Sequence, residues 1–287
     1  MELQDILIRI DDLPTPDPIV QKIVSVASDP DASAKELAEA IKLDASLTVR
    51  ILRLVNSAYY GLPRKIVALN EAIMILGFKT VRNIALSIFT YSSVLKNKKK
   101  SNIDHYQLWK HFLGTAVGCE LLAQMVGYPN KEELFISGLL HDIGKVALDY
   151  IFPEAFNAVT KLTKTLQISF VQAEDRLNLP NHSIVSGKMI ERWNLPEIVV
   201  HSASGHHAPN NFSDSVYADV VAIVHIVDFL VNLMRYGDSY TYGGLTLSSF
   251  ALNVLGIKPR FLTNLADKLK IRLVEAEDFL KIEQEVS

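Results

Sequence analysis

Several features that this 287-residue chain lacks limit what it can be. Its single cysteine, Cys119, excludes an intramolecular disulfide and any metal cluster built on cysteine ligands. Its 29 basic and 32 acidic residues nearly balance, so no global positive field attracts nucleic acid or an anionic membrane. The sequence has no Gly-x-Ser-x-Gly elbow and no glycine-rich phosphate loop, which argues against serine-hydrolase and P-loop chemistry. Any bound metal must therefore use His, Asp or Glu.

The sequence also lacks an apolar run long enough to span a membrane. Its most apolar stretch, Val220 to Met234, is interrupted by His225 and Asp228 and is shorter than the ~20 residues that a spanning helix needs. The N-terminus is acidic and amphipathic, unlike a signal peptide, so we expect a cytoplasmic protein. A His and an Asp inside an apolar helix are costly unless they are paired or bind something. This helix is therefore predicted to be buried and to carry a chemical role.

Apolar side chains recur at three- and four-residue spacing through almost the whole chain, whereas alternating, strand-like runs are scarce. We therefore expect an all-α fold with two helical lobes. A lysine-rich polar run near residues 96–101 interrupts the apolar period and indicates a solvated linker rather than a nucleic-acid patch. The predicted parts are an N-terminal helical bundle over 1–96, a linker over 97–104, a second helical domain over 105–238 and a C-terminal helical appendage over 239–287.

Capping patterns predict where the helices of the N-terminal bundle begin. Ser33 and Glu36 have capping-box spacing, and Asp44 is expected to cap the following helix. The apolar faces of these helices should form the bundle core, with Leu47, Ile51, Leu54, Ile73, Leu76 and Ile84 among its residues. Further helices are predicted near 105–127, 131–149, 153–166, 169–177, 182–193, 196–205, 214–236, 247–256 and 259–282.

An adjacent His and Asp stand in the otherwise apolar segment Leu139 to Lys145. We expect His141 and Asp142 to lie on one helix over 131–149, opened by Asn130. Adjacent helical residues diverge by about 100°, so both side chains reach one ligand only if it lies against the side of the helix. A ligand held between neighbouring helices satisfies this condition.

Other polar residues at helix ends and on apolar helices are candidate partners for this pair: His111, His182, His206, His207 and Asp228. Imidazole nitrogens and carboxylate oxygens suit Fe, Mn, Zn or Ni, and a carboxylate such as Asp142 can bridge two ions. A lone histidine more often bonds a backbone carbonyl, which is our expectation for His105, His201 and His225. Two histidines at a helix end can also merely interact with the helix dipole.

Lys145 lies one turn after His141 and allows three interpretations. Its ammonium group could neutralise a phosphate, pair with the Asp that bridges the metals, or extend to solvent. We predict a catalytic role for Asp142 and Lys145.

These motifs together resemble the HDOD proteins, a branch of the HD superfamily of metal-dependent phosphohydrolases. The resemblance covers about residues 13–235. In the first lobe it rests on Leu13-Pro14, on KLDASLTVRILRLVNSAYYG and on ALNEAIMILGFKTVRNIAL. In the second lobe it rests on GLLHDIGK, on His182 with Gly187, on Trp193 to Pro196, and on His206-His207. The resemblance implies an HD-like helical bundle in the second lobe.

The resemblance also implies a metal site, because seven positions match those that bind two metals in the related HD-GYP phosphodiesterases. They are His111, His141, Asp142, His182, His206, His207 and Asp228. Two divalent ions, of Fe, Mn, Ni or Zn, are the implied cofactors. Two departures argue against a cyclic di-GMP hydrolase. Ala208 to Asn211 replace the Glu and the Gly-Tyr-Pro loop of the HD-GYP pattern, and Gln107 stands where a Glu supports a third metal.

The leading hypothesis is a bacterial-type signal-transduction module whose dinuclear metal site binds a phosphorylated small molecule or a signalling protein. One alternative is an active metal-dependent phosphohydrolase or phosphodiesterase, and the sequence leaves open whether turnover occurs. A second alternative is a metal-free scaffold that binds protein or, with weaker support, DNA through the N-terminal bundle. No interaction with a membrane is expected, and the sequence does not indicate an oligomeric state.

Overall fold

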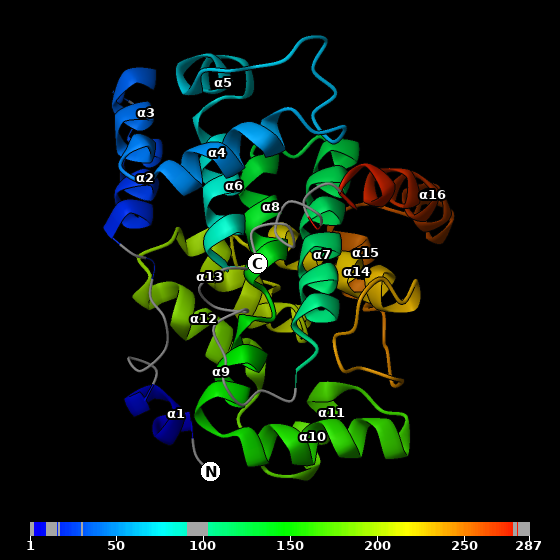
Figure 1. The fold of residues 1–287 in the computed structure, drawn as a ribbon. Helices are drawn as coiled ribbons and strands as arrows, with labels where there is room; N and C mark the ends of the chain where they lie inside the picture. The colour runs from blue at the N-terminus through cyan, green and yellow to red at the C-terminus, as the bar shows by residue number, and fades with distance from the viewer. Residues whose placement is uncertain are drawn as a thin grey trace. The chain divides into compact units, whose positions relative to one another are not determined.

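The protein is described here by a computed structural model, which covers residues 3–9, 16, 18–29, 31–90, 103–277 and 280. Within these residues the chain is helical and contains no strand, which confirms the predicted all-α class with two helical lobes. The chain divides into two compact units (Figure 1), namely a first unit of Met1–Pro14 with Lys98–Leu269, and a second unit of Thr15–Asn97 with Lys270–Ser287. Most of the predicted linker, residues 97–102, lies outside the described residues.

The second unit contains helices whose starts follow the capping patterns in the sequence. Ser33 and Glu36 form the predicted capping box, and the Asp44 side chain accepts a hydrogen bond from the backbone N–H of Leu47 at 3.0 Å. The predicted core residues are buried except Leu76, which is half-buried near the end of its helix. The helices are α2 (Pro18–Ser28), α3 (Ala34–Lys42), α4 (Ala45–Val55), α5 (Leu69–Leu76) and α6 (Phe78–Phe89).

Asn56 holds the connection between α4 and α5 in place. Its Oδ1 accepts the backbone N–H of Ile66 at 2.7 Å, while its Nδ2 donates to the backbone carbonyls of Ile66 at 2.8 Å and Leu52 at 2.6 Å. One side chain thereby satisfies both backbone groups of Ile66, which is itself buried. Asn56, which lies in the stretch KLDASLTVRILRLVNSAYYG, therefore has a structural role in this fold.

The first unit is built around α7 and α8, which pack side by side (Figure 1). Helix α9 packs on α12, and α14 packs on α7. The helices of this unit are α1 (Leu3–Arg9), α7 (His105–Val126), α8 (Lys131–Leu140), α9 (Ile143–Ile151), α10 (Pro153–Leu166), α11 (Phe170–Arg176), α12 (His182–Arg192), α13 (Glu197–Gly205), η3 (Pro209–Phe212), α14 (Ala218–Leu233) and α15 (Ser249–Val254). Helix α16 (Pro259–Glu275) follows.

The expected single helix over 131–149 is wrong, because the chain breaks at the His-Asp pair. Helix α8 ends at Leu140, and His141 and Asp142 form the junction before α9. The break changes the direction of the chain, so two adjacent side chains can reach the same point without lying on one helix face. The predicted cap is also wrong, since the Asn130 side chain makes no capping hydrogen bond.

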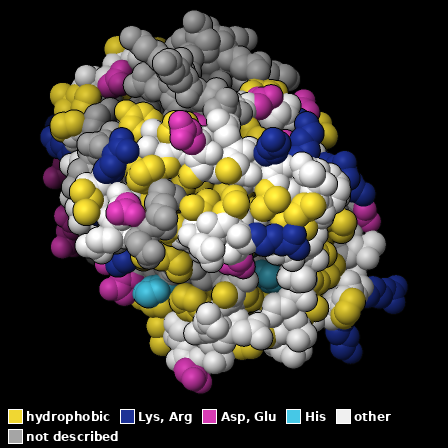
Figure 2. Space-filling model, turned by 90° about the horizontal axis from the view of Figure 1, so that it is seen from below, with side chains coloured by type: hydrophobic (Ala, Val, Ile, Leu, Met, Phe, Trp, Pro, Cys, Tyr) yellow, Lys and Arg dark blue, Asp and Glu magenta, His cyan; other side chains and the backbone are white. Residues whose placement is uncertain are grey.

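The described residues include no single helix that is long and apolar enough to cross a membrane. Helices α5 and α6 pass the same test only as a pair, and they are bent by 116° relative to each other. Figure 2 shows one face of the molecule, on which basic and acidic side chains are interspersed with hydrophobic and neutral ones.

Candidate metal centre

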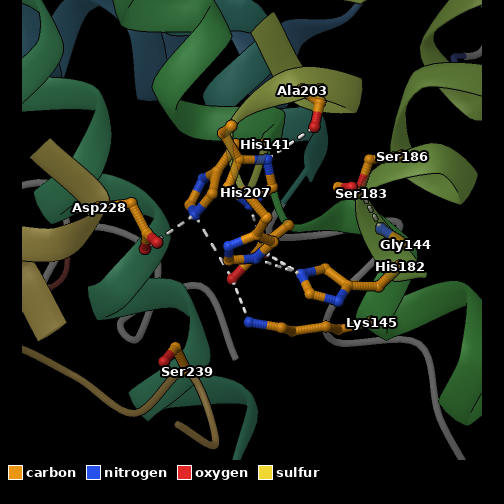
Figure 3. Close-up of polar contacts among 12 residues, drawn as sticks. His141, Gly144, Lys145, His182, Ser183, Ser186, Ala203, His207, Asp228 and Ser239 are labelled. Atoms are coloured by element: carbon orange, nitrogen blue, oxygen red, sulfur yellow. Dashed lines mark hydrogen bonds and ion pairs between the residues drawn. The ribbon is translucent and has the colours of Figure 1, made fainter. Parts of the chain in front are cut away.

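All seven predicted ligands lie together inside the first unit, and Figure 3 labels His141, His182, His207 and Asp228 among them. They form two groups whose ligand atoms are within 4.8 Å of one another, and Asp142 belongs to both. The residues of this His/Asp cluster are His111 on α7, His141 and Asp142 at the break before α9, His182 at the start of α12, His206 and His207 after α13, and Asp228 on α14. All are buried except His207, which is half-buried.

Two glycines of the GLLHDIGK segment let the helices approach closely enough to form the cluster. A Cβ at Gly138 would lie 2.6 Å from the backbone carbonyl of Thr115, so only glycine lets α8 approach α7 so closely. A Cβ at Gly144 would lie 2.1 Å from the backbone carbonyl of His182. The Gly144 N–H also donates to Ser186 Oγ at 2.8 Å, which joins the start of α9 to α12. The residues flanking the His-Asp pair therefore position its partners.

The two carboxylate oxygens of Asp142 face different histidines. Oδ1 lies 2.9 Å from His182 Nε2 and 3.5 Å from His206 Nε2. Oδ2 lies 3.4 Å from the Nε2 atoms of both His111 and His141. Each oxygen thus belongs to one of the two ligand groups, which is the arrangement expected of a bridging carboxylate.

Asp228 belongs to the ligand group that contains His111 and His141. Its Oδ1 lies 3.2 Å from His111 Nε2 and 3.4 Å from His141 Nε2. The same oxygen accepts a hydrogen bond from Asn232 Nδ2 at 2.7 Å, and Asn232 in turn contacts Ser239. The costly Asp on the apolar helix α14 is therefore oriented by Asn232, a neighbour one turn away that is not among the residues predicted from the sequence.

Backbone carbonyls set the tautomer of two cluster histidines. His141 Nδ1 lies 2.7 Å from the Gly138 carbonyl, and His206 Nδ1 lies 2.6 Å from the Ala203 carbonyl. A carbonyl only accepts, so each Nδ1 carries the hydrogen, and in the neutral ring Nε2 presents a lone pair. These Nε2 atoms point into the cluster, as metal-ligating imidazoles require.

Glu174 performs the same task for His182, although it is not among the residues predicted from the sequence. This fully buried carboxylate accepts the Nδ1–H of His182 at 2.9 Å and its backbone N–H at 2.9 Å. A carboxylate behind a ligating imidazole fixes the ring and increases its basicity. The available signal was an acidic residue eight positions before His182 on the apolar side of a helix, which is weak without the fold.

The donor set fits divalent cations. Asp142 Oδ1 and His206 Nε2 are buried and make no hydrogen bond, although buried polar atoms are normally satisfied. Two pairs of imidazoles also face each other through their Nε2 atoms, at 3.2 Å and 3.0 Å. Lone pairs that face each other this closely repel unless a proton or a cation lies between them. Nitrogen and carboxylate ligands suit Fe, Mn, Ni or Zn and do not select among them.

The pKa values of His141 and His206 are shifted in opposite directions. Burial lowers the pKa of His141, but the Asp142 and Asp228 carboxylates outweigh it and raise that pKa to about 9. Burial dominates at His206 and lowers its pKa to about 4. Burial raises the pKa of the Asp142 carboxyl, but the charges of His141, Lys145 and other cationic neighbours hold it well below its usual range. A cation that binds here at neutral pH must therefore displace a proton from His141.

Lys145 pairs with the shared carboxylate and does not extend to solvent. Its side chain is buried, and its Nζ lies 2.5 Å from Asp142 Oδ2 and 5.0 Å from the centre of the Phe170 ring. Of the three interpretations of this lysine, the geometry matches the pairing with Asp142. Its catalytic role stays a prediction.

The remaining histidines lie outside the cluster. His225 donates through Nδ1 to the His206 carbonyl at 2.7 Å and accepts the Ser248 N–H through Nε2 at 3.0 Å, so backbone groups use both of its nitrogens. His201 stacks on Tyr217 with ring centroids 4.5 Å apart. His105 begins α7. His225 therefore supports the peptide that carries His206 and is not a candidate ligand.

A family model and two protein sequences match this chain. The model, described as the HDOD domain, matches residues 13–209. An uncharacterised protein of Treponema pallidum (strain Nichols) is 26% identical over 200 residues, which are 69% of this chain and 38% of that protein. The uncharacterised protein YuxH of Bacillus subtilis (strain 168) is 30% identical over 105 residues, 37% of this chain and 25% of that protein. The chain thus spans well under half the length of these two relatives.

Solved structures share the fold over nearly the whole chain. A Geobacter sulfurreducens HDOD domain protein of unknown function is 26% identical and has a TM-score of 0.71, covering 99% of this chain and 98% of that one. A Shewanella amazonensis SB2B protein, provisionally described as a phosphohydrolase, is 20% identical and has a TM-score of 0.75, covering 96% and 97%. At that identity the second likeness concerns the fold alone.

Proposed function

Since this chain belongs to the HDOD domain family, we propose that it is a signal-transduction module whose His/Asp cluster holds two divalent ions and binds a phosphorylated ligand. The observation that carries the proposal is the position of Asp142 in both ligand groups, with one oxygen directed to each. A single-ion site has no need of a second set of buried imidazoles on the other side of the same carboxylate. Bound ions would also satisfy Asp142 Oδ1 and His206 Nε2, which are buried and make no hydrogen bond.

Different residues of the chain would have different roles in such a site. One group, His111, His141, Asp142 and Asp228, would hold one ion, and Asp142 with His182, His206 and His207 would hold the other. Bound divalent ions would act as Lewis acids toward a phosphoryl oxygen. Glu174 and Asn232 orient ligands from behind, and burial keeps the Nε2 atoms of the cluster away from bulk water.

Hydrolysis is the second candidate function, and one observation favours it. All seven candidate ligands lie together, and the half-buried His207 and the buried Asp228 line a cavity through which a phosphate could reach the ions. The Shewanella protein of the same fold is provisionally described as a phosphohydrolase, which is consistent with this candidate. Cyclic di-GMP is a poor substrate candidate, because Pro209–Phe212 form a short 3₁₀ turn where the HD-GYP pattern has its substrate loop.

Thermal unfolding of the Mn²⁺-loaded chain against a panel of phosphorylated compounds tests both functions, with phosphate release measured in parallel. A signalling module gains several degrees in Tm with one class of compound and releases no phosphate. A hydrolase releases phosphate, and Asp142→Ala abolishes the release. Asp175→Asn is the matched control, because it removes one carboxylate from an exposed position on α11. The proposal is wrong if no compound shifts the Tm of a metal-loaded chain.

A further inference from the structure

A cavity of about 140 Å³ lies beside the His/Asp cluster in the first unit. His207 and Asp228 line it together with His225, so it reaches the candidate metal ligands. Its other walls come from the start of α11, from α14 and from the irregular chain that follows α14. These lining residues are Ser169, Val171, Gln172, Phe229, Asn232, Thr241, Gly244, Leu245 and Thr246.

The chemistry of the lining is neutral and able to form hydrogen bonds. Apart from the cluster residues and His225, whose two ring nitrogens are used by backbone groups, the polar side chains that line the cavity are hydroxyls and amides, and no Lys or Arg is among the lining residues. The buried Lys145 is paired with Asp142 and is also not part of the wall. A ligand with two or more separated phosphates would therefore place at least one of them without a cationic partner. The lining favours a single anionic group attached to a neutral polar body.

The volume sets a second limit. At about 30 Å³ of liquid volume per water molecule, 140 Å³ corresponds to four or five waters. Drug-sized ligands occupy pockets of about 300–1,000 Å³, so this cavity encloses only a small part of a dinucleotide. A phosphate with a substituent of two or three carbons is of the right size.

Hydrogen bonds hold the outer wall in place, so the volume is not that of a loose loop. The segment 238–248, in which Figure 3 labels Ser239, is attached to the body of the unit along its length. Thr241 Oγ1 accepts the Phe170 N–H at 3.2 Å, and the Tyr242 N–H donates to the Ile168 carbonyl at 3.3 Å. The Ser248 N–H donates to His225 Nε2 at 3.0 Å. A preorganised wall excludes large ligands and binds small ones at little entropic cost.

We propose that this cavity selects a small phosphate monoester with a hydroxylated body, using Gln172, Thr241 and Thr246 as specificity-determining residues. The phosphate would lie toward His207 and Asp228 and the ions they help to hold, and the hydroxyl groups would contact the three neutral side chains. The inference rests on the proposed metal site and names the class of ligand for it. Inorganic phosphate has the same anionic group as such a monoester but lacks its hydroxylated substituent.

Gln172 offers a sharp test, because its substitution by Glu preserves the local fold. Its Oε1 accepts the backbone N–H of Ser169 at 3.1 Å in a capping box, and a Glu carboxylate makes the same bond. Gln172→Glu therefore places a negative charge in the wall without removing a cap. Thr246→Val removes one hydroxyl at nearly constant shape. Gln124→Glu makes the same charge change at an exposed position on α7 and is the control.

Isothermal titration calorimetry of the full Mn²⁺-loaded chain would use glycerol 3-phosphate, inorganic phosphate and cyclic di-GMP as probes, with metal content measured on the same samples. We expect glycerol 3-phosphate to bind most tightly. Gln172→Glu should weaken the binding of both phosphates by about tenfold or more, since two negative charges then lie close together in the cavity. Thr246→Val should weaken glycerol 3-phosphate only, and Gln124→Glu should change neither.

The possible results separate this inference from the proposed function. Wild-type protein that takes up no metal overturns the proposed metal site, and the ligand assignment with it. Metal-loaded protein that binds cyclic di-GMP as tightly as glycerol 3-phosphate overturns the ligand class and leaves the metal site standing. Equal binding of inorganic phosphate and glycerol 3-phosphate, unchanged by Thr246→Val, overturns the role of the neutral wall. Unaltered phosphate binding in metal-loaded Gln172→Glu shows that the anion binds elsewhere.

Discussion

Replacing Glu174 tests whether the cluster is built for metal, because the hydrogen bonds of its carboxylate go to the candidate ligand His182. In Glu174→Gln the amide oxygen can still accept the backbone N–H of His182, so the start of α12 should stay in place. The charged acceptor behind Nδ1 is lost, and with it the basicity and orientation of the ring. We therefore expect metal affinity to fall about 10–100-fold, which is about 1.4–2.8 kcal/mol.

The assay is competition with a chelator of known affinity, followed by thermal unfolding of the same samples. Glu174→Ala should lose metal affinity similarly and should also unfold more easily by about 1–3 kcal/mol, because the buried N–H of His182 is left without its acceptor. Asp175→Asn removes the neighbouring, exposed carboxylate and should change neither quantity. Folded Glu174→Gln with metal affinity within about twofold of wild type contradicts the role of Glu174 and a metal-ligating role for His182.

Three further outcomes follow from the structure. Because the pKa of His141 is raised to about 9, protons compete with metal throughout the neutral range. The apparent metal affinity should therefore rise from pH 6 to pH 8, by up to about tenfold per pH unit for each proton displaced. A metal affinity that does not change with pH in the chelator assay would contradict this prediction. Gly144→Ala should bind less metal and should lose about 1–3 kcal/mol of stability in denaturant titrations, since its Cβ would lie 2.1 Å from the His182 carbonyl. Wild-type metal content in this variant would contradict the prediction. Asn56→Ala should lower the free energy of unfolding by about 1–3 kcal/mol, because it leaves the backbone groups of Ile66 unpaired, and it should not lower metal content. An unchanged unfolding midpoint would show that water replaces the hydrogen bonds of Asn56.

The sequence predicted the helices well because their apolar faces and caps are local signals. The Ser33–Glu36 capping box and the Asp44 cap can be read directly from residue types and spacing. The break at His141 and Asp142 could not be predicted this way, since Leu and Ile on both sides continue the helical pattern. Just after the break, Gly144 lies close to the carbonyl of His182 on α12, and no local sequence pattern reports such a tertiary contact.

The candidate ligands were predictable from chemistry, but their supports were not. His and Asp residues on apolar helices are costly, which marks them in the sequence, and the seven candidates do lie together. Glu174 and Asn232 lie on helices whose sequence gives no reason to prefer them over other polar residues, and only the fold brings them behind His182 and Asp228. The cavity wall at 238–248 is an irregular segment without a periodic pattern, so neither its position nor the small volume it encloses could be derived.

Metal content of freshly purified protein, measured by elemental analysis, tests the shared-carboxylate centre most directly. Wild-type protein should carry close to two divalent ions per chain. Asp142→Ala should lose both, because each ligand group uses one oxygen of this residue, whereas His206→Ala should weaken mainly the group that contains His182 and His207. Wild-type protein without metal, or an Asp142→Ala variant that keeps both ions while folded, would contradict the account.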